Sequence, residues 1–257
     1  MTPLPDEYRY AAAVTARVPR PFHYRWLLPA LLGVDARRWR AVQVGSLAAL
    51  CGLLWAQTGA WWSVLLVVGL SGLTFNLRHP ILVDLPALAL AYGAAVAWDH
   101  KMWWLAVPLV LVAGCVKESA PVFAVAFAWH PVLLVGLIPV AVRHLMDPGP
   151  DPIPDGAAHD ALERPVRVSW AHHKALPLWV YVLPWGVLLA ALTNGSPQLW
   201  VALGLAYAQL LVATDAVRLY QWAAPAVIVA AVPVLGGPWL AVALVLHLVN
   251  PFRTEGI

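Results

Sequence analysis

The sequence reads DEYRY at residues 6–10, PFHYRWLLP at residues 21–29 and DARRWR at residues 35–40. Ten charges fall between Asp6 and Arg40, whereas the chain beyond Arg40 is almost wholly apolar. Most of the remaining charges recur at the ends of apolar runs. We therefore interpret residues 1–40 as a segment at a membrane surface, and the later segments as a scaffold that brings further charges to the same face.

The composition is that of an integral membrane protein. The chain has 257 residues, of which 61% are hydrophobic and 11% are charged, and its mean hydropathy is +0.73. A soluble domain carries about 25% charged residues, so this chain has too little polar surface to cover a water-soluble globule. MTPLPDEYRY lacks the basic and apolar regions of a signal peptide. We expect a multi-pass protein of a bacterial cell membrane, and the sidedness of its charged face stays open.

The pattern predicts an all-α polytopic bundle of about eight to ten membrane segments. We expect a single membrane domain with an interfacial segment at 1–40, membrane segments at 41–145 and 175–250, and a polar, Pro-rich loop at 146–174. Within the first part, Tyr8 to Val18 predicts an interfacial amphipathic helix. The apolar runs are Ala41–Gln57, Trp61–Asn76, Ile81–Trp98, Met102–Val116, Ala120–Trp129, Val132–Val142, Leu176–Leu192, Leu199–Ala213, Trp222–Leu235 and Trp239–Val249.

The stretch Ala120–Val142 has two interpretations. His130-Pro131 divides it, so it is either a hairpin of two short helices or one span kinked at Pro131. The hairpin places every charged residue except Asp99 and Lys101 on one face of the membrane, and the single span destroys that segregation. We therefore favour the hairpin.

The first candidate catalytic residues are Asp6 and Glu7. A carboxylate held at the edge of a bilayer can act as a general base on an acceptor hydroxyl. The alternative is structural, because acidic residues also favour the first turn of a helix. Spacing alone does not separate the two.

A basic cluster follows, interleaved with aromatic residues. Attraction to anionic lipid headgroups explains such a cluster at about 1 kcal/mol per basic residue, whereas the functional alternative is a phosphate clamp, because guanidinium binds phosphate oxygens in a fork. Arg25 lies inside an otherwise apolar stretch and is the hardest to explain as a surface charge, so we favour function there. The cluster comprises Arg20, Arg25, Arg37, Arg38 and Arg40.

Further charges interrupt the apolar runs. Asp84 lies four residues inside one run and needs a partner, for which Arg78 and Arg25 are candidates. Lys117-Glu118 stands between two apolar runs, either as an interfacial pair with a snorkelling lysine or as part of a site. Asp215 and Arg218 are three residues apart, which favours a local ion pair at a helix end.

Other classes of site lack support in the sequence. There is no Gly-rich phosphate loop and no Cys-x-x-Cys pair, and the histidines lack zinc spacing, so we predict no dedicated metal site. The basic residues lie in membrane context, which argues against nucleic acid as a partner.

The combination of the acidic start, PFHYRWLLP, RHPILVD at 78–84, VKESAP at 116–121 and TDAVRLYQWAAP at 214–225 resembles the multi-pass GT-C-type membrane glycosyltransferases. The resemblance implies sugar transfer from a polyprenyl-phosphate-linked donor to an acceptor glycan, lipid or protein. It would make Asp6 or Glu7 catalytic and would give the donor phosphate to some of Arg25, Arg78, Lys117 and Arg218. We expect Tyr24, His79, Asp84 and Glu118 to support the site.

That chemistry needs no metal, and a divalent ion between Asp6, Asp84 and Glu118 is compatible with the spacing without being required by it. Two features depart from the family pattern. The apolar span that usually precedes the acidic loop is missing, which implies a small version of the fold. The active face also carries every Lys and Arg except Lys101, which the positive-inside rule assigns to the cytoplasm, whereas the family works on the other side.

Three rival functions stay open. A different enzyme of lipid phosphates would use the same cations but would need a nucleophile or a metal pair. A transporter would place charges near the middle of the membrane and usually shows an internal repeat. An assembly protein would use the Pro-rich loop to bind a partner.

Overall fold

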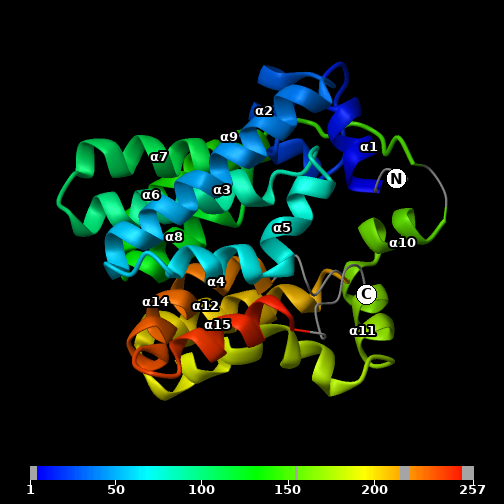
Figure 1. Ribbon diagram of the computed structural model, residues 1–257. Coiled ribbons are helices and arrows are strands. Elements are labelled where there is room, and N and C mark those ends of the chain that lie inside the picture. The colour runs from blue at the N-terminus through cyan, green and yellow to red at the C-terminus, as the bar shows by residue number, and fades with distance from the viewer. Residues whose placement is uncertain (1–4, 154–155, 215–219, 251–257) are drawn as a thin grey trace. The chain divides into compact units, whose positions relative to one another are not determined.

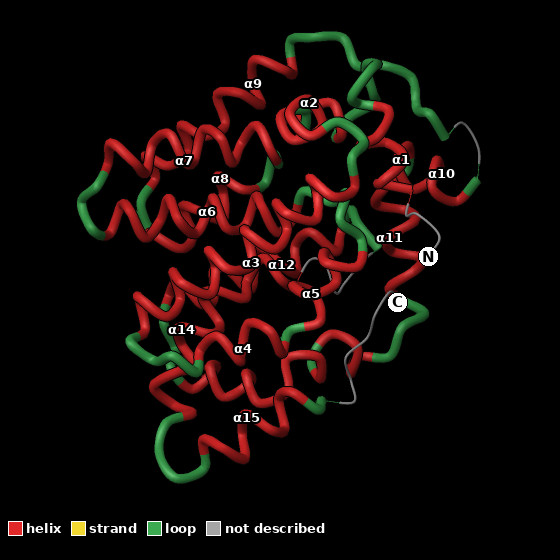
Figure 2. The backbone as a smooth tube through the Cα atoms, turned by 45° about the horizontal axis from the view of Figure 1, so that its top comes forward, coloured by secondary structure: helices red, strands yellow, loops and turns green. Residues whose placement is uncertain are grey.

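The computed structural model describes residues 5–153, 156–214 and 220–250. All regular secondary structure in these ranges is helical, as Figures 1 and 2 show, which confirms the all-α class. Contacts between residues divide the chain into two compact units. Unit 1 comprises Met1–Leu50 and Asn76–His159, and unit 2 comprises Cys51–Phe75 and Asp160–Ile257. We describe each unit by itself, and the single membrane domain stays a prediction.

Unit 1 contains the N-terminal segment and the central apolar runs. Its elements are α1 (Pro5–Ala12), the 3-10 helix η1 (Phe22–Tyr24), α2 (Leu27–Leu32), α6 (Asp84–Asp99), α7 (Trp103–Val116), α8 (Ala120–Ala128), the 3-10 helix η2 (Pro131–Leu137) and α9 (Ile138–His144). Helices α3 (Ala36–Thr58) and α5 (Ser71–Arg78) each have residues in both units.

Helix α6 is the core of unit 1. Nearly every residue from Asp84 to Ala97 is buried, and α7 and α8 both pack against it (Figure 1). Its many alanines give a slim helix that neighbouring helices can approach closely. A helix that is apolar on all sides is typically enclosed by other helices, and this one also carries Asp84 at its first turn.

The structure has the two short helices of the predicted hairpin. Helix α8 ends at Ala128, and Trp129 takes a left-handed conformation with φ 53°. His130 is extended, and its side chain accepts a hydrogen bond from the N–H of Val132 at the start of η2. Both α7 and α8 pack against η2.

The contact between α7 and η2 depends on Gly114. A Cβ atom on Gly114 would lie 1.9 Å from the carbonyl oxygen of Gly136. We expect Gly114→Ala to destabilise the protein by about 1–3 kcal/mol, because the two backbones must separate. The free energy of unfolding measures this. Gly45→Ala is the control: its Cβ would meet nothing within 4 Å, so helix propensity should make it neutral or stabilising. Equal effects of the two substitutions would contradict the close contact.

Unit 2 contains the second half of the apolar runs. It comprises α4 (Ser63–Gly69), α11 (Pro165–His173), η3 (Leu178–Tyr181), η4 (Leu183–Thr193), α12 (Pro197–Ala208), η5 (Gln209–Leu211), η6 (Gln221–Ala223), α14 (Ala224–Leu235) and α15 (Leu240–Leu248). The Asn194 side chain donates to the carbonyl of Ala230 at 3.0 Å, which joins the end of η4 to α14. His247 contacts the carbonyl of Leu66 at 2.9 Å, which joins α15 to α4.

Two expectations from the sequence were wrong in their bounds. The first helix runs from Pro5 to Ala12 rather than from Tyr8 to Val18, and it buries Arg9 and Tyr10 instead of presenting them to a membrane surface. The 146–174 loop contains α10 (Ala157–Glu163) and α11. The dense Pro and Gly spacing stops at Gly156, and AAHDALE favours a helix, while Pro165 suits the first position of the next one.

The predicted number of membrane spans is not established. Among the described residues, only α3 is long and apolar enough to cross a bilayer by length and composition. Shorter apolar helices cover Trp103–Val116, Pro131–His144, Leu183–Thr193 and Gln221–Leu235.

Candidate functional site

Arg25 and Glu118 form a bidentate ion pair within unit 1. The Nε of Arg25 donates to one carboxylate oxygen at 2.8 Å, and Nη2 donates to the other at 2.5 Å. Nη1 donates to the hydroxyl of Tyr10 at 2.9 Å. Arg25 is buried and Glu118 is about a quarter exposed. The arginine that is hardest to explain as a surface charge is therefore an internal one.

The electrostatics of this pair follow from its geometry. Burial raises the pKa of Glu118, but the charge and hydrogen bonds of Arg25 outweigh this and lower the pKa overall. Burial also opposes the charge on Arg25, yet Glu118 and Tyr10 hold its pKa above the usual value. Both groups are charged at neutral pH.

Lys117 and Asp84 form a second buried ion pair beside the first. Lys117 follows the last turn of α7, and Asp84 lies in the first turn of α6. Each charge therefore also suits the dipole of its helix end. Asp84 has the internal partner that its depth requires, but that partner is Lys117 rather than Arg78 or Arg25, the two candidates chosen from the sequence.

Of the two predicted bases, Asp6 and Glu7, Glu7 is the buried one. It lies in the first turn of α1, and one of its carboxylate oxygens is 3.4 Å from Nδ1 of His79. Glu7 and Tyr10 are three residues apart, so they share one side of α1, and Tyr10 binds Arg25. Asp6 is partly exposed and lies 4.0 Å from Arg9.

We call Glu7, Arg25, His79, Asp84, Lys117 and Glu118 the charge cluster. Four segments that are distant in the sequence supply it: α1, the stretch after η1, the stretch from His79 to the first residue of α6, and the link between α7 and α8. Two ion pairs and the charge interaction between Asp84 and Arg25 join four of its members. Glu7, which contacts His79, belongs to the helix whose Tyr10 hydroxyl binds Arg25.

The segment that carries His79 and Asp84 is held by Gln43 of α3. The buried Gln43 amide donates to the carbonyls of Pro80 at 2.8 Å and Leu82 at 2.5 Å. These carbonyls lie outside a helix and would otherwise be buried without a donor. Gln43 thus positions both ends of the segment relative to α3.

An ion pair between Arg9 and Asp151, which the sequence analysis did not predict, also fixes α1. Arg9 donates to both oxygens of Asp151, at 3.0 and 2.7 Å, and His159 lies 3.4 Å from the same carboxylate. The Phe22 ring lies 5.2 Å from the guanidinium carbons of both Arg9 and Arg25. An aspartate within a Pro-rich loop gave no signal of this role.

The remaining predicted residues lie elsewhere. Arg78 is exposed, and Tyr24 contacts His144 at 2.8 Å instead of the charge cluster. Arg218 and its neighbour Asp215 lie outside the described residues.

No protein-family model, curated protein or solved structure matches this chain.

The carboxylates of the charge cluster are arranged as partners of cations. Asp84 binds Lys117 and Glu118 binds Arg25. In residues 5–153, 156–214 and 220–250, no three His, Cys, Asp or Glu side chains gather as a metal site would require. The arrangement can hold a carboxylate base, Glu7, near guanidinium and ammonium groups, which suits proton abstraction beside an anionic group.

Proposed function

We propose that the protein is a membrane glycosyltransferase that uses a polyprenyl-phosphate-linked sugar donor. The observation that carries the proposal is the charge cluster, because the fold draws a carboxylate and two cations from separate segments into one part of unit 1. Transfer of a sugar from a lipid phosphate needs a base for the acceptor hydroxyl and positive charge for the departing phosphate.

Membrane residence is supported by the exposed tryptophans. Indole rings concentrate at the level of lipid headgroups. Nine tryptophans of the described residues are exposed, and seven of them lie within three residues of the stretches 57–60, 98–101, 130, 193–198 or 236–237, which the pattern of apolar runs assigns to the face opposite the charges. These seven are Trp55, Trp61, Trp103, Trp104, Trp129, Trp200 and Trp239.

Glu7 is the better of the two predicted bases. Its contact with Nδ1 of His79 fixes the carboxylate, and a fixed base needs no reorganisation before proton transfer. Asp6 is partly exposed and lies near Arg9. We therefore assign proton abstraction to Glu7.

Arg25 and Lys117 are the proposed donor-phosphate cations. A guanidinium carries five N–H bonds, and Arg25 uses three of them, with Glu118 and Tyr10. Two N–H bonds, one on each Nη nitrogen, are left for a phosphate. Lys117 adds positive charge, because it also acts on Glu118.

The test is a transfer assay on protein reconstituted in lipid. We expect release of radiolabelled sugar from polyprenyl-phosphate donors and none from nucleotide sugars. Arg25→Ala should abolish release, whereas Arg40→Gln, which removes an exposed arginine of α3, should preserve it. Failure with every polyprenyl-phosphate sugar tried, or equal activity of Arg25→Ala, would refute the proposal.

A structural role for the same residues is the second candidate. Arg25 and Lys117 each have a carboxylate partner within the protein, as they would in a cluster that only fixes the fold. Removing the cluster without unfolding the protein separates the two candidates.

A further inference from the structure

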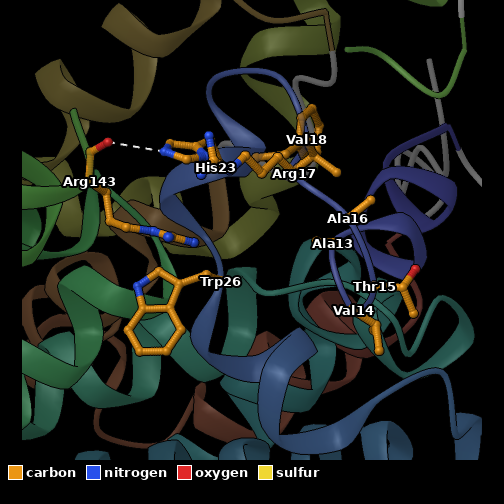
Figure 3. Close-up of a pocket in the computed structure, with 10 residues that line it drawn as sticks. Ala13, Val14, Thr15, Ala16, Arg17, Val18, His23, Trp26 and Arg143 are labelled. Carbon is orange, nitrogen blue, oxygen red and sulfur yellow. Dashed lines mark hydrogen bonds between the residues drawn. The ribbon is translucent and has the colours of Figure 1, made fainter. Parts of the chain in front are cut away.

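A cavity of about 310 Å³ lies in unit 1, and no residue of the charge cluster lines it. Its wall consists of Ala13–Val18, Phe22, His23, Trp26 and Arg143. Figure 3 shows the guanidinium of Arg143 between His23 and Trp26, with the side chain of Arg17 extending toward His23. The volume is at the small end of the range for ligand pockets, about 300–1,000 Å³.

The end of α9 shapes this pocket. The last carbonyls of a helix have no partner within it, and here neighbouring side chains bind them. His23 contacts the carbonyl of Arg143 at 3.0 Å, and Arg20 donates to the carbonyl of His144 at 2.9 Å. The stretch 20–23 is thereby fixed beside the Arg143 side chain.

The other wall is fixed by a close backbone contact. The N–H of Gly149 donates to the carbonyl of Val18 at 3.1 Å. A Cβ atom on Gly149 would lie 2.0 Å from the carbonyl oxygen of Arg17. Only glycine allows the two backbones to approach this closely, so Gly149 helps to fix the position of the segment that carries Arg17.

The pocket is positively charged and lacks a counter-charge. No ion pair of the described residues includes Arg17, Arg20 or Arg143. Among the described residues, the buried Nε of Arg143 has no hydrogen-bond partner. Arg143 lies 5.3 Å from the centre of the Trp26 ring, which orients its guanidinium without neutralising it.

The same excess of positive charge affects the pKa of His23. Burial lowers its pKa, its bond to the Arg143 carbonyl raises it, and nearby Arg143, Arg20 and Arg17 lower it further. The net direction is downward, so His23 is a neutral hydrogen-bonding group at neutral pH. The positive charge of the pocket comes from its arginines.

We propose that this pocket binds a phosphate group, carried either by a small soluble ester or by a lipid headgroup. Guanidinium groups match phosphate oxygens in a fork, and two arginines face one small cavity without a carboxylate partner. Trp26 and Phe22 supply an apolar wall for the group that bears the phosphate. The inference does not depend on glycosyl transfer, because the pocket uses none of the charge cluster.

The experiment has two arms, one for each source of phosphate. In the first, inorganic phosphate is titrated calorimetrically into the full chain in phosphatidylcholine nanodiscs. In the second, native mass spectrometry counts phosphatidic acid retained from mixed micelles against phosphatidylcholine. Saturable phosphate binding without selective retention of phosphatidic acid identifies a soluble ester, whereas selective retention of phosphatidic acid identifies a headgroup.

Substitutions of the pocket arginines test whether the phosphate group binds in this pocket. We expect Arg17→Gln and Arg143→Gln each to weaken binding by about tenfold or more, because charge-assisted hydrogen bonds are the strong ones. Arg167→Gln, which removes an exposed arginine of α11 outside the pocket, should bind as the parent does. Arg17 is exposed, so its replacement should leave the fold intact.

Two outcomes would overturn the proposal. The parent would bind in neither arm, or Arg17→Gln and Arg143→Gln would both bind as tightly as the parent. Loss of sugar transfer alone would not bear on this pocket, and loss of phosphate binding in Arg17→Gln would not bear on the charge cluster.

Discussion

Glu118→Ala is expected to destabilise the protein by about 3–5 kcal/mol, because it leaves Arg25 buried without its carboxylate partner. Arg25 donates to both oxygens of Glu118 and is itself buried. The free energy of unfolding in mixed micelles measures the effect. The control is Arg38→Ala, which breaks the exposed pair with Asp35 at 3.5 Å and should cost about 1 kcal/mol or less.

The Arg25–Glu118 pair also makes the free energy of unfolding depend on pH, and the pKa shift of Glu118 gives the direction of that dependence. The pKa of Glu118 is lower in the folded protein than its usual value. Its contribution is therefore fully present above the usual glutamate pKa of about 4.3 and is lost as the pH falls through the lower, folded value. Glu118→Ala should reduce this acid sensitivity. An equal acid dependence in parent and variant would contradict the ion pair.

Replacing both members of the Arg25–Glu118 pair by apolar residues should restore much of the stability that Glu118→Ala loses. Well-packed apolar residues often replace a buried ion pair without net cost. We expect Arg25→Met with Glu118→Leu to be much more stable than Glu118→Ala alone. Tyr10→Phe added to this pair removes the hydroxyl that binds Arg25 and avoids an unsatisfied buried group.

Glu7→Gln is expected to lower the rate of sugar transfer by about 10²–10⁴-fold, the usual contribution of a general base. Glutamine keeps a side chain of the same length that can still contact His79, so the fold should be preserved. Asp6→Asn should have a smaller effect, because Asp6 is partly exposed and lies beside Arg9. Initial rates at saturating donor distinguish the two variants.

The control for this prediction is Glu163→Gln, which changes an exposed carboxylate of α10. It should transfer sugar at the parental rate. A Glu7→Gln protein that stays folded and transfers sugar as fast as the parent would remove the assignment of the base. A larger loss in Asp6→Asn than in Glu7→Gln would transfer the role to Asp6.

Apolar patterning predicted much of the helical architecture. The runs Ile81–Trp98 and Met102–Val116 correspond to α6 and α7, and His130-Pro131 separates two short helices as expected. Pattern alone did not predict the break at Leu70, which divides one apolar run into α4 and α5. Apolar residues on both sides of such a break leave no periodic signal.

The candidate site was predicted in part. The isolated charges Arg25, Asp84, Lys117 and Glu118 do meet, because each interrupts an apolar stretch and needs a partner. Their pairing was not predictable, since it depends on which helix ends face each other. The anchor Asp151 and the pocket arginine Arg143 act through tertiary contacts with the 9–26 stretch, and local spacing carries no signal of such contacts.

The most direct measurement is the transfer rate of folded protein that carries Tyr10→Phe, Arg25→Met and Glu118→Leu together. We expect a folded, parent-like circular dichroism spectrum with loss of sugar transfer from polyprenyl-phosphate donors. Transfer at the parental rate by this folded variant would show that the Arg25–Glu118 pair serves stability alone, and would contradict the proposed role of the charge cluster.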